Sequence, residues 1–586
     1  GATDSAYASA WAEDFVVYQS AIGSTVTLTN NGDMTIGFAA NAAGDESASA
    51  YAGVTTAVYQ SAEGTAPSLN FVNSATGVFD VSADATATAD DAYAYAIAGG
   101  VYQFTGDPGT FTFNNAGSFS VAANADANGA TEGSATATAQ GYYAEGSPGL
   151  AFSNSGTFNV SATAAGLDDA YAYAIGAEVD GSEGTGTITG TMSNAGTITV
   201  VADADASGLA GVTAVTPQLG SAYATGIYMH SNTNAATITN SGTIDVSAIV
   251  DDGSSVGAWG IYIGNNGAPT GVGSMSIVNA AGNIWASEST DGGATFVWGD
   301  AINTVNAPNA VAISLLGDGS TYLGAYPAGP VDHGDIYGNI ELSADDAVNV
   351  AFGETWFDGL VNAPAYAAWS DSDALTDPDT YATGSLTIED DGLLFLRDDR
   401  GEADDSVDYA GPAHVFVDSF TMEAGGVLAL ELPSDPTGGA QTVDTYPSVY
   451  ATEADITGGI LEVRPSSSNG LYDDDYFFDN VVETGAGGLT GTFADVRTTS
   501  VLLDADDTYD ADGNVDLDVS RVAFDGVAGL NINQSAVGGA IEGTYSSALD
   551  ATNPEYANLL ATLFTIADPV EYANALDALS ADQYAG

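Results

Sequence analysis

The chain has 586 residues, no cysteine, and 78 acidic side chains against five basic ones, giving a formal net charge of −73. All five basic side chains are arginines and the first is Arg397, so nucleic acid and anionic membranes are poor partners for the preceding residues. Neither a disulfide nor a thiolate metal site is available, and no apolar run is long enough for a membrane-spanning helix. The acidic excess favours a solvated coat on an extended β-protein, with divalent cations as alternative partners.

Copies of one short motif lie between Leu28 and Ala286. Each consists of a hydrophobe, a spacer, Asn, a usually small residue, Gly, a spacer and a hydrophobe, and two copies carry small insertions. The flanking apolar residues have a period of two, which predicts strands with one buried face. We expect the motif to end each strand, because Gly accepts a positive φ and Asn tolerates one. The copies are Asn30–Gly32, Asn73–Gly77, Asn115–Gly117, Asn154–Gly156, Asn194–Gly196, Asn240–Gly242 and Asn279–Gly282.

The motif recurs about every 40 residues, which suits two solenoid turns of about 20 residues each. A second coil, rich in Tyr and Ala, alternates with the first: Val17–Ala21 is repeated as Val58–Ala62, and Asp90–Ile97 returns as Asp168–Ile175. Stacked coils pair their strands in parallel, and parallel crossovers are right-handed. We therefore predict an all-β fold, a right-handed parallel β-helix (β-solenoid) with a short helical C-terminal tail. Strand phase alone leaves open whether the tyrosines face inward or outward.

The spacing of apolar, glycine and proline residues divides the chain into four segments. Residues 1–306 form the regular β-solenoid of two-coil repeats, and residues 307–384 form an irregular solenoid with insertions. Residues 385–530 are strand-rich with Gly and Asp turns, and residues 531–586 have a helical period. The expected helices are Gln534–Leu549, Tyr556–Ile566 and Pro569–Leu579, with Pro554 and Pro569 as helix starts.

The last part of the chain carries a family resemblance. Its motifs are Tyr509 at a turn, Val515 and Leu517 in a final strand, Asn533-Gln534 at a helix start, the stretch Tyr572–Ala585, and the segment Phe420–Val463. In these motifs the chain resembles the end of an autotransporter (type V secretion) passenger, just ahead of the membrane β-barrel. The resemblance implies that residues 385–530 are an autochaperone-like stabilising region and that residues 531–586 are the linker before a barrel. The barrel itself is absent, which fits either a passenger released near Gly586 or a truncated chain, and we favour release.

The resemblance implies export through the outer membrane of a Gram-negative bacterium, with the chain's own barrel as a partner during export. We expect a non-catalytic secreted or cell-surface structural protein: an adhesin, a surface coat or a self-assembling filament subunit. The alternative is a glycoside hydrolase-like enzyme with a paired-Asp site on the β-helix. A catalytic pair should occur once, whereas these pairs recur, which favours turn residues. The pairs are Asp90-Asp91, Asp168-Asp169, Asp251-Asp252 and Asp345-Asp346.

Calcium is the one cofactor that the sequence suggests. An acidic stretch before and within the final strand offers the oxygen ligands that calcium prefers. Asp512-Gly513 also suits an ordinary hairpin turn, and the bidentate Glu of an EF-hand is missing. The candidate ligands are Asp504, Asp506, Asp510, Asp512, Asn514 and Asp516.

The N-terminal coil matches the Tyr/Ala coil from its start, without a capping segment before it. Its strand edge is therefore expected to be open, which invites stacking of copies head-to-tail or laterally. Surface glycans and neighbouring cell surfaces are further possible partners of the Tyr-rich exterior. The residues expected to mediate self-association are Ser5, Tyr7, Trp11, Val17 and Tyr18.

Overall fold

The protein is described by a computed structural model. It covers residues 5–146, 148–181, 187–206, 219–230, 233–251, 255–264, 275–294, 296–307, 310–317, 334–362, 382–398, 412–433, 439–441, 445–466, 471–510, 513–545 and 554–580. These residues are mostly strand, which confirms the all-β class, and their helices lie near the C-terminus. They form two compact units: unit 1 (Gly1–Ile313 and Asp335–Asp346) and unit 2 (Ser314–Gly334 and Ala347–Gly586).

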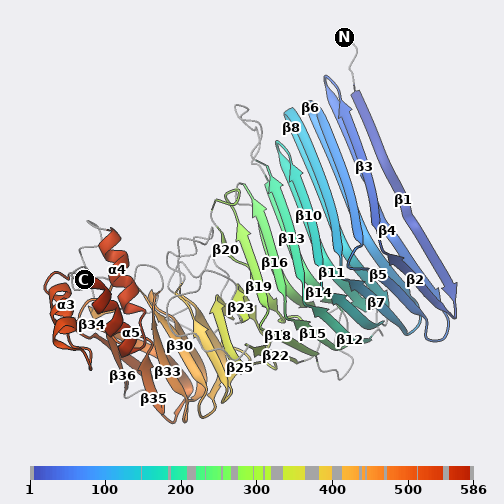
Figure 1. The fold of residues 1–586 in the computed structure, drawn as a ribbon. Coiled ribbons are helices and arrows are strands. Elements are labelled where there is room, and N and C mark those ends of the chain that lie inside the picture. Colours follow the sequence, from blue (N-terminus) through green and yellow to red (C-terminus); the bar gives the residue numbers. More distant parts are fainter. Residues whose placement is uncertain are drawn as a thin grey trace. The chain divides into compact units, whose positions relative to one another are not determined.

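The strands of unit 1 stack in three ladders, and every pairing within them is parallel (Figure 1). Paired residues lie about 40 positions apart, as Ser5 and Ser47 do, so each repeat adds one strand to each ladder. The predicted division of the repeat into two stacked turns of about 20 residues was therefore wrong for the described residues, because the Tyr/Ala strands pair with one another and not with the strands of the Asn-Gly motif. The first ladder is β1 (Ser5–Ile22), β4 (Ser47–Glu63), β6 (Val78–Thr105), β8 (Ser118–Gly146), β11 (Asp169–Gly181), β14 (Leu219–His230), β17 (Ser255–Gly264), β21 (Asp300–Asn303) and β24 (Asn339–Glu341). The second is β2 (Thr25–Asn30), β5 (Ser68–Asn73), β7 (Gly109–Asn115), β9 (Pro148–Asn154), β12 (Thr187–Asn194), β15 (Thr233–Asn240) and β18 (Met275–Ala280). The third is β3 (Asp33–Ala43), β6 and β8 again, β10 (Thr157–Ala165), β13 (Thr197–Asp205), β16 (Thr243–Val250) and β19 (Asn283–Ser289). Short strands β20 (Val297–Trp298), β22 (Val311–Leu316) and β23 (Gly334–Tyr337) follow.

Columns of phenylalanine fill the interior of unit 1. The rings of Phe79, Phe119 and Phe158 stack in register on successive coils, with centroids 4.6 Å apart at each step. Glycines of the first ladder face this column, because a Cβ at Gly100 would lie 3.0 Å from the Phe119 ring and a Cβ at Gly141 would lie 2.6 Å from the Phe158 ring. Alanines of the same ladder, such as Ala94 and Ala172, are fully buried. The tyrosines that alternate with these alanines therefore face outward, which answers the question that strand phase had left open. Large Phe rings on one wall and glycines on the facing wall keep this part of the interior filled.

The Asn of each repeated motif is the buried last residue of a strand or lies beside its end, and successive copies form one ladder of amide hydrogen bonds. Asn115 Nδ2 donates to Asn154 Oδ1 at 2.8 Å, and Asn154 Nδ2 donates to Asn194 Oδ1 at 2.8 Å. The same bond joins the other successive copies from Asn30 to Asn279. Each Nδ2 from Asn30 to Asn240 also donates to a backbone carbonyl of the next coil, as Asn154 does to Thr197.

The positive φ expected at the Asn and Gly residues of these motifs was wrong: none of the seven Asn or seven Gly residues adopts one, and within the motifs only Ala281, between Asn279 and Gly282, does. The glycines are required for close approach instead. A Cβ at Gly196 would lie 2.1 Å from the carbonyl oxygen of Gly156, and a Cβ at Gly242 would lie 2.0 Å from that of Gly196. Backbone atoms of consecutive coils occupy the space that a side chain would need.

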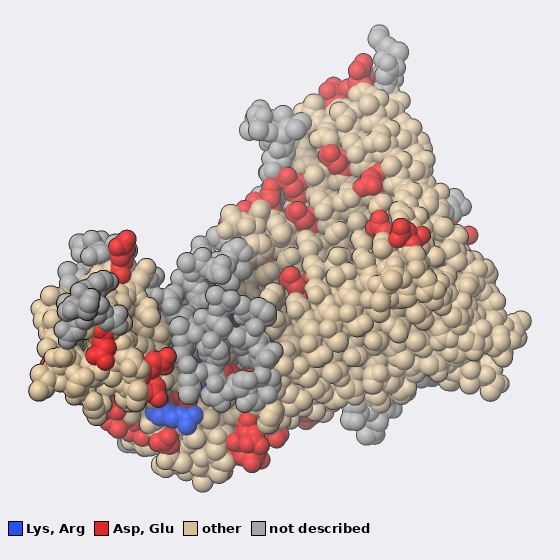
Figure 2. Space-filling model, viewed as in Figure 1, with Lys and Arg blue, Asp and Glu red and all other residues tan. Residues whose placement is uncertain are grey.

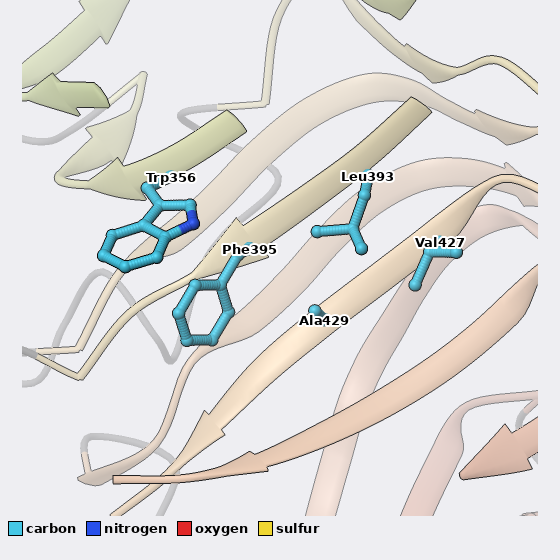
Figure 3. Close-up of a cluster of buried hydrophobic side chains, with 5 residues drawn as sticks. All are labelled: Trp356, Leu393, Phe395, Val427 and Ala429. Atoms are coloured by element: carbon cyan, nitrogen blue, oxygen red, sulfur yellow. The ribbon is translucent and has the colours of Figure 1, made fainter. Parts of the chain in front are cut away.

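Unit 2 has mainly parallel strands and a C-terminal antiparallel part. The parallel pairs link β25 (Ala347–Asp358), β27 (Ser385–Ile388), β28 (Gly392–Leu396), β29 (His414–Met422), β30 (Val427–Leu432), β32 (Ser448–Asp455), β33 (Ile460–Pro465) and β35 (Asp495–Thr498), with short β26 (Leu360–Val361) and β31 (Gly439–Ala440) at the side. β34 (Asp475–Thr490) pairs in parallel with β32 and antiparallel with β37 (Val515–Arg521), which also pairs antiparallel with β36 (Leu503–Tyr509). Figure 3 shows a buried cluster in which residues on β25, β28 and β30 lie in register: Trp356, Leu393, Phe395, Val427 and Ala429.

The helical tail consists, in the described residues, of α3 (Ile532–Glu542), α4 (Pro554–Phe564) and α5 (Pro569–Leu579). Asn531 caps α3, and its capping box with Gln534 explains why the helix begins at the predicted Asn-Gln pair. The helix ends before Gly543, so its predicted extension to Leu549 was wrong. α5 begins at Pro569, as predicted, with Asp568 as its cap.

Unit 2 also holds every described arginine, and each is paired with carboxylates. Arg464 Nη1 lies 2.5 Å from Glu354 and its Nε lies 2.7 Å from Glu462, and both glutamates are 1% exposed. Arg397 pairs with Asp358. Arg497 pairs with Glu462, and Arg521 pairs with both Asp474 and Glu542.

Candidate functional site

An open strand edge lies at the N-terminal end of unit 1. In the described residues, β1 pairs only with β4, β2 only with β5, and β3 only with β6. One side of each of these three strands therefore presents unpaired backbone N–H and C=O groups. An edge of this kind is a template for the addition of another strand.

The five residues predicted to mediate self-association all lie on β1. Tyr7 and Tyr18 are 72% and 58% exposed, whereas Trp11 and Val17 are partly buried. Ser5 is exposed and its Oγ accepts a hydrogen bond from Ser47. The sequence reasoning missed three exposed hydrophobes on the same strand, although their apolar run was visible: Phe15, Val16 and Ile22.

The asparagine ladder ends at this edge with a free acceptor position for another coil. In the coils that follow, each Oδ1 accepts from the Asn of the preceding coil, as Asn154 accepts from Asn115. Asn30 is the first member, and its Oδ1 accepts only a 3.3 Å bond from Gly32 of its own turn. A coil placed against this edge with an amide donor in register would extend the ladder.

A second, glutamine ladder ends at the same edge with a donor. Gln103 Nε2 donates to Gln60 Oε1, and Gln60 Nε2 donates to Gln19 Oε1, both at 2.8 Å. The buried hydroxyl of Tyr142 closes the other end by donating to Gln103 at 2.9 Å. Gln19 Nε2 has only a long 3.4 Å bond to the Thr27 carbonyl. The open edge therefore offers one acceptor and one donor at defined places.

Tyrosines form in-register columns on the outer face of the first ladder. In one column the ring centroids of Tyr18, Tyr59, Tyr102 and Tyr143 are 5.6, 5.0 and 4.8 Å apart. The Tyr102 hydroxyl donates to Glu145. Burial, followed by this hydrogen bond, raises the pKa of Tyr102 well above its usual value, so the phenol stays neutral.

The next position of that column is a carboxyl group, Glu178, between Tyr143 and Tyr228. Gln140 donates to Glu178 at 2.5 Å. Burial and then the nearby Asp180 raise the pKa of Glu178 to about 7, although the Gln140 bond acts in the opposite direction. In Figure 2, acidic groups are scattered over the visible face and cationic groups show in only one small patch. No Lys or Arg occurs before Arg397, so unit 1 supplies neither to offset Glu178.

We predict that Glu178 makes the protein less stable as pH rises. Its pKa is about 7 when folded and close to 4.5 when unfolded, so the folded state binds the proton more tightly between these values. Stability from this group is fully present below pH ~4.5 and is lost as pH rises through ~7, by up to about 3 kcal/mol. Glu178→Gln should flatten that part of the pH profile, measured by urea denaturation from pH 4.5 to 8. Glu132→Gln, at an exposed position of β8, is the control; equal flattening by both variants would contradict the prediction.

The candidate calcium ligands surround a hairpin turn between β36 and β37. Asn514 N donates to Asp510 Oδ1 at 2.9 Å, and Gly513 has φ +89°. Asp516 accepts from the backbone of Asn480, while Asp504 and Asp506 are exposed on β36. Asp512 lies outside the described residues. Within the described part of the chain, no three His, Cys, Asp or Glu side chains are grouped to hold a metal, so calcium binding stays a prediction.

Asp252 of the recurrent acidic pairs lies outside the described residues, and the other members lie at turns and strand irregularities. Asp90 and Asp91 are exposed beside a register shift in β6. Asp168 accepts from Gly133 N. Asp346 is buried and accepts from Thr304 Oγ1, Val311 N and Ser343 N, as a turn-stabilising carboxylate does.

Comparisons with known proteins do not identify the chain: no family model, no curated protein and no solved structure matches it. None of the described helices combines the length and apolar character needed to cross a membrane. What defines the protein is therefore its own geometry, an all-β repeat architecture with an open edge and an aromatic outer face.

Proposed function

We propose that the protein is a non-catalytic structural protein of the cell surface or the external medium, which associates through the open edge formed by β1, β2 and β3. The observation that carries the proposal is the unpaired side of these strands, where two amide ladders also end. In this proposal the repeats, which stack in register, give the molecule its length and its outer surface for contacts. Adhesin, surface coat and filament subunit are the roles that suit such a molecule.

We infer that unit 1 is a right-handed parallel β-helix. The chain visits the three ladders in a fixed order, β1, β2, β3 and then β4, β5, β6, and each visit adds one parallel strand to each ladder. Parallel crossovers are right-handed in nearly all proteins because of strand twist. About 40 residues per repeat would then give this rod its length.

We further propose that the chain is exported as an autotransporter passenger and remains outside a Gram-negative cell. The support is the resemblance of the C-terminal motifs, together with their local structures. The predicted final strand is β37, and α3 opens at the Asn-Gln pair with Asn531 as its cap. In this proposal unit 2 includes the stabilising region, and the barrel of the same protein is the partner during export.

The test of self-association compares edge variants with matched surface variants. Phe15→Asp with Ile22→Asp removes exposed apolar groups from β1 and adds like charges at the edge. Val78→Asp with Val305→Asp makes the same change at hydrophobes that are 38% and 48% exposed and lie outside β1. We expect the edge variant to weaken association about tenfold or more, a difference of about 1.4 kcal/mol, and the control to leave it unchanged. Sedimentation velocity and electron microscopy, each with calcium and with chelator, are the measurements.

Monomers in all preparations, or equal weakening by both variants, would remove the support for the proposed self-association. Assembly that needs calcium and disappears with chelator would instead assign a role to the acidic groups. If the edge variant still assembled, the interface would have to lie on another surface of the protein.

A further inference from the structure

A hollow lined by aromatic side chains lies on the outer face of β1, β4 and β6. Its volume is about 490 Å³, and it is lined by Tyr7, Ser9, Trp11, Tyr51, Tyr93 and Tyr95. This volume is in the range of sites for small ligands. The hollow belongs to the sheet face, so it is distinct from the backbone edge that the proposed function uses.

The register of the strands creates the hollow. Tyr51 lies opposite Ser9 of β1, and Trp11 lies opposite Gly53 of β4. Tyr93 lies opposite Ser49. At these three positions a large residue lies opposite a small one, whereas Tyr95 lies opposite Tyr51, and the hollow remains beside the small residues.

The Tyr51 ring is tilted against those of Tyr7 and Tyr93, whereas Trp11 and Tyr95 are stacked with 27° between their planes, so the rings do not form one continuous stack. The Tyr51 ring is inclined by 37° to that of Tyr7 and by 44° to that of Tyr93, with centroids 5.4 and 5.5 Å apart. Trp11 and Tyr95 lie 6.0 Å apart. Burial raises the pKa of Tyr51, Tyr93 and Tyr95, so their rings carry neutral phenols.

The charges near the hollow are negative. Asp91 is exposed on the same face of β6 as Tyr93, two residues before it, and Asp14 is exposed on β1. No Lys or Arg occurs in unit 1. The negative faces of aromatic rings attract cations within about 6 Å, and Trp and Tyr surround quaternary ammonium groups in aromatic cages.

We propose that this hollow binds the quaternary ammonium group of a small molecule through the faces of Trp11 and its tyrosines. A neutral ligand would gain nothing from the acidic surroundings, and an anion would meet no cationic partner. The site takes a ligand free in solution, because its volume fits a small molecule. Binding there does not depend on self-association.

The test uses choline chloride and 3,3-dimethylbutan-1-ol, a neutral molecule of nearly the same shape, in isothermal titration calorimetry with the 586-residue chain. We expect choline to bind at least tenfold more tightly than the alcohol. Trp11→Ala and Tyr51→Leu should each weaken choline binding about tenfold, and Tyr7→Leu, at an exposed position, should weaken it about threefold. Tyr171→Leu, at an outward tyrosine that does not line the hollow, is the matched control.

Equal affinity for the two compounds would overturn the cation–π assignment, since apolar filling alone would explain it. Loss of binding in Tyr171→Leu as large as in Tyr51→Leu would show diffuse attraction to an acidic surface and would also overturn it. Absence of choline binding, or binding of inorganic phosphate in its place, contradicts the proposal. Circular dichroism of each variant checks that the strands remain formed.

Discussion

Asn154→Leu is expected to lower the free energy of unfolding of unit 1 by about 3–6 kcal/mol. Asn154 is 1% exposed and accepts from Asn115 on one side. On the other side it donates to Asn194 Oδ1 and to the Thr197 carbonyl, at 2.8 and 3.0 Å. Leucine has the same branched skeleton of heavy atoms but satisfies none of these groups, and each unpaired buried group costs about 1–3 kcal/mol. Urea denaturation followed by circular dichroism measures the loss.

Asn159→Leu is the matched control for this prediction, because Asn159 is exposed on β10 only five residues away. We expect it to change stability by less than about 0.5 kcal/mol. Asn30→Leu gives an intermediate case, since Asn30 begins the ladder and has no preceding Asn to leave unpaired. Equal effects at Asn154 and Asn159 would show that the ladder contributes no stability.

The repeated motif shows what the sequence predicts well and where it misleads. Alternating apolar residues located the strands, because burial of one face acts on every second residue. The reason for Asn and Gly was misjudged, since a local rule about positive φ was applied to an interaction between coils. The bonds join residues separated by 39 to 46 positions, and only stacking shows that Gly196 must lack a Cβ.

The orientation of the tyrosines could not be deduced from their own strands. Either the Ala face or the Tyr face of such a strand could be buried. Which of them points inward depends on the residues of the wall that it packs against. Part of that wall consists of the Phe119 and Phe158 rings, which lie so close to Gly100 and Gly141 that no side chain fits there, and Ala94 on the same ladder is fully buried. The hollow beside Trp11 depends further on register, because Gly53 must lie opposite the indole. Composition alone reveals neither which face of these strands is buried nor which residues lie opposite each other.

The arginines were visible in the sequence, but their partners were not. Arg464 lies 110 residues from Glu354 and two from Glu462, and it joins both in the interior of unit 2. Its guanidinium also lies over the Phe395 ring, 4.6 Å from the centroid. A net charge of −73 favours the view that the few cations are placed where acidic groups are buried.

Arg464→Met should destabilise unit 2 by about 3–5 kcal/mol, the usual cost of removing one partner from a buried ion pair. The Arg464 side chain is 7% exposed, and Glu354 and Glu462 are 1% exposed. Methionine fills much of the same space, but it leaves Glu354 without this counter-charge in a medium where desolvation is costly. Unfolding in urea at neutral pH measures the effect through the fluorescence of Trp356 and its neighbours.

Arg497→Met is the control, because Arg497 is 40% exposed and shares Glu462 with Arg464. We expect it to cost about 1 kcal/mol or less, as for exposed ion pairs. Adding Glu354→Gln to Arg464→Met should recover part of the lost stability, since it removes the stranded charge. If Arg464→Met and Arg497→Met were equally costly, or if Glu354→Gln gave no recovery, loss of the buried pair would not be the cause.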